Sequence, residues 1–248
     1  MSNSSPAREG AKRDIAPIVF CDFDGTVTPL DVTDQILTQL AHPSWREIER
    51  EWMLGLIGSR ECLERQIALV DAPPEELHAV IDSITIDPHF SAFCRFTRRR
   101  RMPLYIVSDG FDYVIHRVLK RAGVAGAFRN GSRLFASALR VEGHRLLPSF
   151  PHSAEPCEHG CATCKAAIIR HHSEGRQPIV FVGDGMSDRF AVEVADLAFA
   201  KRRLLAHCRE SGIACHPFET FKDVQGTLEK LLAPTPARRC RQPVAALS

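Results

Sequence analysis

The stretch Ile18-Val19-Phe20-Cys21-Asp22-Phe23-Asp24-Gly25-Thr26 decides how the rest of this sequence is interpreted. Its first four residues are apolar and rich in strand formers, which predicts a short buried strand. Two carboxylates follow, two positions apart, so an extended backbone points both to one side with Cα atoms roughly 6.6 to 6.8 Å apart. Like charges this close repel unless a cation lies between them or one takes a proton. The stretch therefore predicts a bound Mg²⁺, an acid/base pair, or both.

Composition and charge are those of a globular protein and indicate neither a nucleic acid nor a membrane as partner. The chain has 248 residues, of which 44% are hydrophobic and 25% charged, enough for one large domain or a core with a smaller inserted domain. The 32 basic and 30 acidic residues leave a net charge of +2, which gives no reason to expect nucleic acid or a membrane as partner. The sequence does not fix the oligomeric state and leaves a homodimer open.

Two absences and the cysteine count favour the cytoplasm. Residues 1–14 lack the apolar segment of a secretory signal, and no run approaches the ~18 apolar residues of a membrane span. The nine cysteines are an odd number, which favours reduced thiols over a disulfide framework. We therefore predict a cytoplasmic protein.

The hydrophobic pattern divides the chain into tails, a core and an insert. Residues 1–16 and 233–248 are polar, charged or proline-rich, and we expect them to be disordered tails. Helical patterns without any strand pattern follow the first strand, at residues 32–41, 44–56, 59–70 and 74–84. We expect residues 31–86 to form an all-helical cap inserted into a core of residues 17–30 and 87–232. The alternative is a helical subdomain without a functional role.

The core sequence alternates short apolar strands with helices. Strong strand patterns recur at residues 104–107 and 179–182, with weaker ones at 197–200 and 214–217 and a hairpin pattern at 133–150. Helical patterns separate them. This alternation is typical of an α/β fold with a doubly wound, mostly parallel, Rossmann-like sheet and helices on both faces. The predicted fold is such a sheet with a small inserted all-helical cap.

Each strong strand ends in polar residues, and a lysine begins a later helix. Parallel strands share one carboxyl edge, where ligands of such sheets bind, so these side chains are expected to converge: Asp22, Asp24, Thr26, Ser108, Lys165, Asp184 and Asp188. Carboxylates suit Mg²⁺, and a hydroxyl and an ammonium beside the metal suit a phosphoryl group. One carboxylate can form an aspartyl-phosphate, while a second protonates the leaving oxygen and then activates water.

The motifs Asp22-Phe23-Asp24-Gly25-Thr26, Ser108, Lys165 and Gly183-Asp184-Gly185-Met186-Ser187-Asp188 resemble, in order and spacing, those of the haloacid dehalogenase superfamily. The resemblance covers residues 18–199. It implies an enzyme, a phosphoric monoester hydrolase that uses Mg²⁺ and an aspartyl-phosphate to dephosphorylate a small-molecule phosphate ester.

The resemblance also implies a role for each motif residue. Asp22 is the nucleophile, Asp24 the general acid/base, and Lys165 neutralises the phosphoaspartate. Thr26 and Ser108 bind phosphoryl oxygens. The implied metal ligands are Asp22, Asp24, Asp184 and Asp188. Asp24 would bind through its backbone carbonyl, and Asp188 would support the site. We expect Asp109 and Gly110, which follow Ser108, to contact substrate. For Asp109 the alternative role is that of N-cap residue of the following helix.

Asp24 narrows the reaction within the superfamily. Phosphonatases carry Ala at this position and dehalogenases lack the acid, whereas phosphatases and some mutases keep it. Hydrolysis of a phosphate monoester is therefore the leading prediction, and a phosphomutase is the alternative.

The insert resembles the cap of the phosphoserine-phosphatase-like branch. Residues 151–153, 157–165 and 197–221 are more closely similar to the methionine-salvage phosphatases that act on 2-hydroxy-3-keto-5-methylthiopentenyl-1-phosphate. Phosphoserine phosphatases carry a Glu near Asp31 and a cap Arg near Gln66, for which neighbouring Arg65 is a candidate substitute. In the salvage enzymes Gly or Ser is more usual than Asp109 after the serine. These departures leave the substrate open between the salvage ester, phosphoserine and an unassigned ester.

The loop before Lys165 is rich in cysteine. Cys157, Cys161 and Cys164 lie near two histidines, His152 and His159, with a spacing compatible with zinc. Zinc sites more often consist of two separated pairs, so we favour reduced thiols and keep zinc as the alternative.

Overall fold

The computed structural model describes residues 16–128, 133–154, 157–173 and 177–233. The tails predicted at 1–16 and 233–248 lie outside this part of the chain except for their innermost residues. Within the described part, no helix is long and apolar enough to span a membrane.

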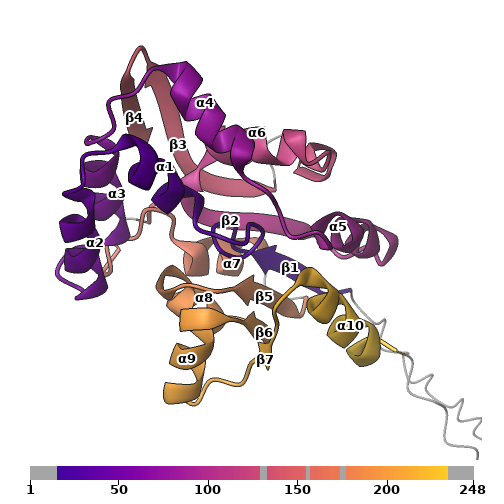
Figure 1. The fold of residues 1–248 in the computed structure, drawn as a ribbon. Coiled ribbons are helices and arrows are strands. Elements are labelled where there is room, and N and C mark those ends of the chain that lie inside the picture. Colours follow the sequence, from indigo (N-terminus) through magenta and orange to yellow (C-terminus); the bar gives the residue numbers. More distant parts are fainter. Residues whose placement is uncertain (1–15, 129–132, 155–156, 174–176, 234–248) are drawn as a thin grey trace, which may run out of the picture.

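A seven-stranded sheet forms the centre of the molecule, in the order β4-β3-β2-β1-β5-β6-β7 (Figure 1). Neighbouring strands are parallel except for the antiparallel pair β3 and β4. The strands are β1 Ile18–Cys21, β2 Leu104–Phe111, β3 Leu134–Glu142, β4 Arg145–Ser149, β5 Ile179–Gly183, β6 Leu197–Ala200 and β7 His216–Pro217. The doubly wound, mostly parallel α/β fold and the hairpin predicted at 133–150 are confirmed.

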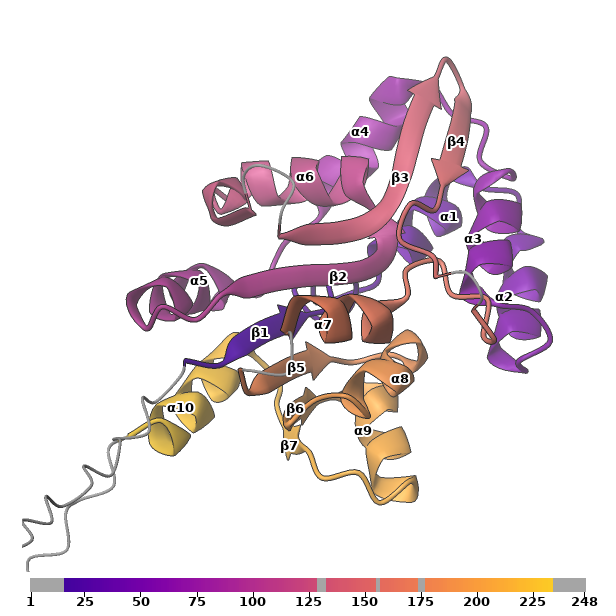
Figure 2. The same ribbon diagram turned by 180° about the vertical axis from the view of Figure 1, so that it is seen from behind.

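Helices cover both faces of the sheet, as the alternation of β1 requires. Val19 and Cys21 belong to one buried cluster, together with side chains of α5 (Phe90–Arg99), α6 (Asp112–Arg121) and α10 (Phe221–Leu231). Ile18 and Phe20 belong to the other, with α7 (Lys165–Ser173), α8 (Arg189–Val192) and α9 (Arg202–Glu210). In Figure 2, α7 lies in front of β1. All four residues of β1 are buried, so this strand is the centre of the core.

The segment between β1 and α5 contains helices alone, as predicted. They are α1 Val32–Leu40, α2 Trp45–Met53, α3 Ser59–Ile67 and α4 Pro74–Ser83. In both views α1 to α3 lie beyond the carboxyl ends of β1 and β5, α3 contacts β4, and α4 contacts α6. Their apolar side chains continue the cluster on one face of the sheet. The division into a core and a cap at residues 31–86 stays a prediction.

Strand β2 is longer than its hydrophobic pattern indicates. The apolar run ends at Val107, but the strand continues to Phe111, which pairs with Ser137 of β3 after a register shift. Three polar or small residues, 108–110, are therefore held in extended backbone at the sheet edge. Backbone pairing with β3 extends the strand to Phe111, so the hydrophobic pattern of the side chains does not predict where β2 ends.

Phe221 of α10 gives a direct test of the packing. Its ring centroid lies 4.8 Å from that of Phe90 and 5.0 Å from that of Phe93. We expect Phe221→Ala to lower the free energy of unfolding by about 3 to 5 kcal/mol, because it leaves a cavity beside the rings of Phe90 and Phe93. Leu231→Ala on the same helix is the matched control, since Leu231 is 54% exposed, and should cost less than about 1 kcal/mol. Urea unfolding curves measure both, and equal losses would contradict the packing described.

Candidate active site

A buried lysine joins two of the predicted carboxylates. Asp22 directly follows β1, and its Oδ1 accepts a hydrogen bond from Nζ of Lys165, the first residue of α7, at 2.7 Å. The same Nζ donates to Oδ1 of Asp188 at 2.6 Å. All three side chains are at least 94% buried. The three strand and helix ends thus meet in one ion-paired cluster, as the sequence predicts.

The charges of this cluster shift its proton affinities. Burial raises the pKa of Asp22 well above its ordinary range, the negative charge of Asp188 raises it further, and Lys165 opposes both. Burial would lower the pKa of Lys165, but the charges of Asp188 and Asp22 raise it well above its usual range. The lysine is therefore a permanent cation beside Asp22.

Asp24 lies in a different environment from Asp22. Its Oδ1 accepts a hydrogen bond from the backbone N–H of Val32 at 3.0 Å, and its Oδ2 accepts one from the Ser108 hydroxyl at 3.1 Å. Burial and the charge of Asp31 raise the pKa of Asp24 to about 7. A carboxyl group with this pKa can donate a proton and later accept one near neutral pH.

Gly110 allows this arrangement because it has no side chain. A Cβ at residue 110 would lie 2.2 Å from Oδ2 of Asp24, and the Gly110 N–H donates to the Ser108 hydroxyl oxygen at 2.9 Å. The structure thus places Ser108, Gly110 and Asp24 in contact. It gives Gly110 a steric and hydrogen-bonding reason to be glycine, while its contact with substrate stays a prediction.

Thr26 and Asp184 form the neighbouring part of the site. The Thr26 hydroxyl donates to Oδ1 of Asp184 at 3.1 Å, and Nη1 of Arg202 donates to Oδ2 of Asp184 at 3.2 Å. Arg202 also donates to the carbonyl oxygen of Gly25 at 3.2 Å. Gly25 has a φ of +74°, and a Cβ there would lie 2.3 Å from Oδ2 of Asp184, so glycine is required both by the turn and by the close approach.

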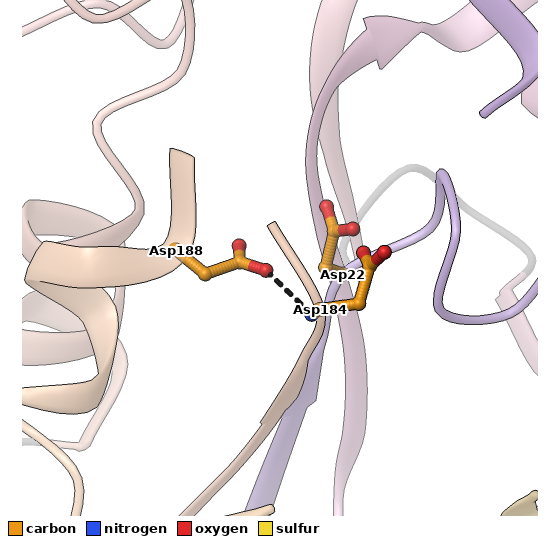
Figure 3. Close-up of side chains that lie close together, drawn as sticks. All are labelled: Asp22, Asp184 and Asp188. Carbon is orange, nitrogen blue, oxygen red and sulfur yellow. Dashed lines mark hydrogen bonds between the residues drawn. The ribbon is translucent and has the colours of Figure 1, made fainter. Parts of the chain in front are cut away.

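Asp22, Asp184 and Asp188 are arranged as a metal site would need. Each offers a carboxylate oxygen within 4.8 Å of the others, and all three residues are buried. Figure 3 shows the carboxylates of Asp22 and Asp184 side by side, with Asp188 approaching from the 3₁₀ turn Met186–Asp188. The dashed bond runs from the Asp184 N–H to Oδ2 of Asp188, at 3.0 Å. Hard oxygen donors of this kind fit Mg²⁺.

The carboxylates of this set are not equally available to a cation. Asp188 Oδ1 accepts from Lys165, and its Oδ2 accepts the N–H groups of Asp184 and Gly185. Among the described residues, the Asp22 side chain accepts one side-chain hydrogen bond, on Oδ1. Asp188 is therefore well suited to hold the site together, while its supporting role at the metal stays a prediction.

Asp109 does not cap the following helix. The N-cap residue of α6 is Phe111, without a side-chain cap, whereas Oδ1 of Asp109 accepts the backbone N–H of Thr163 at 3.0 Å. The alternative role as a helix cap is therefore wrong, because the carboxylate faces the loop that precedes Lys165. Asp109 does line the cavity described next, so its contact with substrate stays a prediction.

A cavity of about 510 Å³ opens directly over this cluster. Its floor includes Asp22, Asp24, Ser108 and Asp184, and its remaining wall comes mainly from α1, α2 and α3. Aromatic, polar and apolar side chains of these helices face it, among them Trp45, Glu49, Trp52, Met53, Leu63 and Gln66. The volume is that of a small-molecule site.

Two residues of the site were missed by the sequence analysis. Arg202, which binds Asp184, lies two residues after the strand pattern at 197–200. The rule that polar residues directly after a strand belong to the site would therefore have indicated it. Ser59 of α3 accepts the N–H of Ala162 at 3.0 Å, and no sequence signal identifies that contact, because it joins segments about 100 residues apart.

The described residues of the cysteine-rich loop do not bring three metal-ligating side chains close together. There, the acidic set of Asp22, Asp184 and Asp188 is the one group of three His, Cys, Asp or Glu side chains close enough to hold an ion. Cys157, Cys161 and Cys164 are free thiols. Reduced thiols stay the prediction for this loop, and zinc stays the alternative.

Comparison with known proteins identifies the family. The model of the haloacid dehalogenase-like hydrolases matches residues 19–193. The chain belongs to the haloacid dehalogenase-like hydrolases. The 2-hydroxy-3-keto-5-methylthiopentenyl-1-phosphate phosphatase of Bacillus velezensis is 29% identical to this hydrolase over 218 residues, 87% of this chain and 91% of the relative. The enzyme of the same name from Bacillus mycoides is 30% identical, over 86% and 96% of the two chains.

Solved structures agree with the fold of this haloacid dehalogenase-like hydrolase. A phosphoserine phosphatase with a phospho-aspartyl intermediate analogue has a TM-score of 0.66 at 21% identity, covering 86% of this chain and 99% of that one. A substrate-bound phosphoserine phosphatase complex gives the same TM-score. The predicted family is confirmed, and the names of the relatives bear out the prediction of a phosphoric monoester hydrolase.

Lys165 provides a test of the charge cluster. We expect Lys165→Met to lower the free energy of unfolding by about 3 to 5 kcal/mol at pH 8, because two buried carboxylates lose their cation. The pKa of Asp22 then rises further above the value of about 3.9 in the unfolded chain. The folded variant therefore binds the extra proton as the pH falls, and its stability should recover toward pH 5.

The exposed pair Arg65–Glu51 supplies the control. Its atoms are 2.6 Å apart, with side chains 40% and 38% exposed, so Arg65→Met should change the free energy of unfolding far less than Lys165→Met does at pH 8, and by the same small amount at either pH. Urea unfolding of both variants at pH 5 and pH 8 in metal-free buffer checks the prediction. A Lys165→Met stability independent of pH would contradict it.

Proposed function

We propose that this hydrolase uses Mg²⁺ to hydrolyse a small-molecule phosphate monoester through an aspartyl-phosphate on Asp22. The observation that carries the proposal is the pairing of two unlike carboxyl groups at the floor of one cavity. Asp22 is held beside a permanent cation, Lys165, whereas Asp24 has a pKa of about 7 and hydrogen-bonds to Ser108. One is suited to attack and the other to move a proton.

The proposed reaction has two steps. A carboxylate oxygen of Asp22 attacks phosphorus, the bond to the ester oxygen breaks, and protonated Asp24 gives its proton to that leaving oxygen. Asp24, now ionised, takes a proton from water, which attacks the same phosphorus and releases phosphate from Asp22. Lys165 offsets the negative charge beside Asp22 throughout.

Thr26 and Ser108 would hold the phosphoryl oxygens during both steps. Mg²⁺, bound by Asp22, Asp184 and the carbonyl oxygen of Asp24 with Asp188 in support, would neutralise charge on those oxygens. The helices over the cavity would exclude bulk water from the phosphoaspartate.

For the substrate we propose the 2-hydroxy-3-keto-5-methylthiopentenyl-1-phosphate named for the relatives at 29–30% identity. Trp52, Met53 and Leu63 give the cavity apolar walls, which suit a thioether tail. Phosphoserine is less well matched. Gln66 donates to Glu49 at 3.0 Å, and Arg65, the candidate substitute for a cap arginine, pairs with Glu51 and does not line the cavity. The cytoplasmic location and a homodimer stay predictions.

Two variants test the covalent mechanism. Asp22→Asn should abolish phosphate release, because the amide cannot form the phosphoenzyme, while its circular dichroism stays unchanged. Asp24→Asn should lower kcat by about 10²- to 10⁴-fold and leave phosphate on the Asp22 peptide after acid quench and mass spectrometry. Asp71→Asn, on an 88% exposed side chain, is the control with normal turnover. Chelation with EDTA should stop the wild type, and retained turnover in Asp22→Asn would overturn the mechanism.

A substrate panel tests the second half of the proposal. We expect the highest kcat/KM for the methylthiopentenyl ester among that ester, phosphoserine, phosphocholine and sugar phosphates. Trp52→Ala should lower this value by about 10- to 200-fold while changing turnover of acetyl phosphate, which has no tail, far less. Accumulation of free phosphate separates hydrolysis from a phosphomutase reaction. A preference for phosphoserine would refute the substrate but leave the mechanism standing.

A further inference from the structure

The loop that precedes Lys165 is in direct backbone contact with the first turn of α3. The carbonyl oxygen of Gly160 accepts the N–H of Arg60 at 3.0 Å, and the Ala162 N–H donates to the Ser59 hydroxyl at 3.0 Å. A Cβ on Gly58 would lie 2.4 Å from the Gly160 carbonyl oxygen, so the two backbone segments lie too close together for residue 58 to carry a side chain. We call this contact, between residues 58–60 and 160–162, the cap contact.

Two cysteines flank the loop side of the cap contact. The Cys161 N–H donates to Sγ of Cys157 at 3.4 Å, and the two thiols hydrogen-bond to each other. Gly160, with a φ of +58°, closes the turn through its N–H to the Cys157 carbonyl oxygen at 3.4 Å. Both cysteines are partly accessible to solvent. The fold therefore holds two reactive groups against each other within one five-residue turn, 157–161.

The two thiols differ in the way that a disulfide-forming pair requires. Burial would raise the pKa of Cys157, but the backbone N–H groups of Cys161 and His159 that face its sulfur lower it. Burial and the charge of Asp109 raise the pKa of Cys161 to about 12. Cys157 is thus the better nucleophile, since thiolates react and thiols do not, and Cys161 is the partner that resolves its oxidised form.

A second thiol pair in the described chain, Cys208 and Cys215, serves as a comparison. Cys208 and Cys215 also hydrogen-bond through their side chains, but Cys208 is fully buried, and burial raises its pKa to about 11. Cys208 belongs to α9, and Cys215 packs against the same buried cluster. Of the two pairs, the one in the turn is the pair in which both thiols are partly accessible and one thiol has a lowered pKa.

We propose that Cys157 and Cys161 form a site of reversible oxidation, in which a hydroperoxide converts them to a disulfide and weakens the cap contact. The Cys157 thiolate attacks the peroxide oxygen, an S–O bond forms, the O–O bond breaks, and the leaving oxygen departs as water or alcohol. Cys161 sulfur then attacks Cys157 sulfur and expels the second oxygen as water. One peroxide is reduced, two thiols are oxidised, and added thiol restores them.

The disulfide acts on the cap contact because of its place in the turn. Gly160, whose carbonyl oxygen binds Arg60, lies inside the ring that a Cys157–Cys161 bond closes. The same loop continues through Thr163, which Asp109 holds, to Lys165. Constraining the turn therefore moves the Gly160 carbonyl oxygen away from the Arg60 N–H. It also changes the backbone conformation of the loop that leads to Lys165. The effect on turnover rests on the proposed phosphatase function, whereas the disulfide and the loss of the cap contact do not.

Peptide mapping tests the site without using activity. The full-length protein is titrated with hydrogen peroxide, digested without reductant and analysed by mass spectrometry. We expect a Cys157–Cys161 disulfide before any Cys208–Cys215 disulfide, and in Cys161→Ser a sulfenic acid at Cys157 that dimedone traps. Cys157→Ser should give neither product. Oxidation of the Cys208–Cys215 pair at the same or lower peroxide concentration, or no disulfide in the turn, would overturn the proposal.

Hydrogen exchange and turnover then test the consequence. On oxidation of the wild type, the amides of Arg60 and Ala162 should exchange at least about tenfold faster, since each loses its acceptor in the cap contact, and dithiothreitol should reverse this. Phosphate release should fall in parallel. Cys157→Ser should keep slow exchange and normal turnover in peroxide, and Cys215→Ser should respond like the wild type. Unchanged exchange at both amides in the mapped disulfide form would refute the link to the cap contact.

Discussion

The pairing of the Lys165 ammonium with Asp22 and Asp188 is the interaction on which the rest of the site depends. It places one cation between two carboxylates in a nearly dry environment, where an unpaired charge would cost several kcal/mol. The pairing also joins three segments, the end of β1, the start of α7 and the turn after β5. Any backbone that satisfies it brings these ends to one edge of the sheet.

The same interaction gives the two motif carboxyl groups unlike properties. Asp22 is fixed beside a cation, whereas Asp24 is turned toward Ser108 and the start of α1 and keeps a pKa of about 7. Different hydrogen-bond partners thus separate the environments of two carboxyl groups that lie two residues apart. Glycines at 25 and 110 make this possible, because a Cβ at either position would collide with a carboxylate.

The helices between β1 and α5 connect this chemistry to recognition. They supply most of the cavity wall, and α3 touches the loop that leads to Lys165. The helices that line the cavity and the loop that leads to Lys165 are therefore joined through contacts of Ser59, Gly160 and Asp109. A covalent change in the cysteine turn would act on that link without touching the carboxylates.

Much of the fold and of the motif set was predictable from local sequence. Apolar runs that end in Asp22, Ser108 and Asp184 indicated parallel strands with a shared carboxyl edge, since buried strands and the ends of parallel sheets leave periodic signals. The extension of β2 to Phe111 was not predictable, because backbone pairing with β3 holds polar residues there. The cap role considered for Asp109 was wrong for a similar reason, as a distant N–H of Thr163 takes its carboxylate.

The sequence by itself determined which residue types meet at the sheet edge and therefore the family and class of chemistry. The tertiary structure alone decided what each residue does there. Hydrogen-bond partners such as Arg202 for Asp184, and Ser59 for Ala162 in the loop before Lys165, are 18 and 103 residues away in the sequence. Charge, burial and partner geometry set pKa and reactivity, and these are properties of packing between distant segments that no local pattern records.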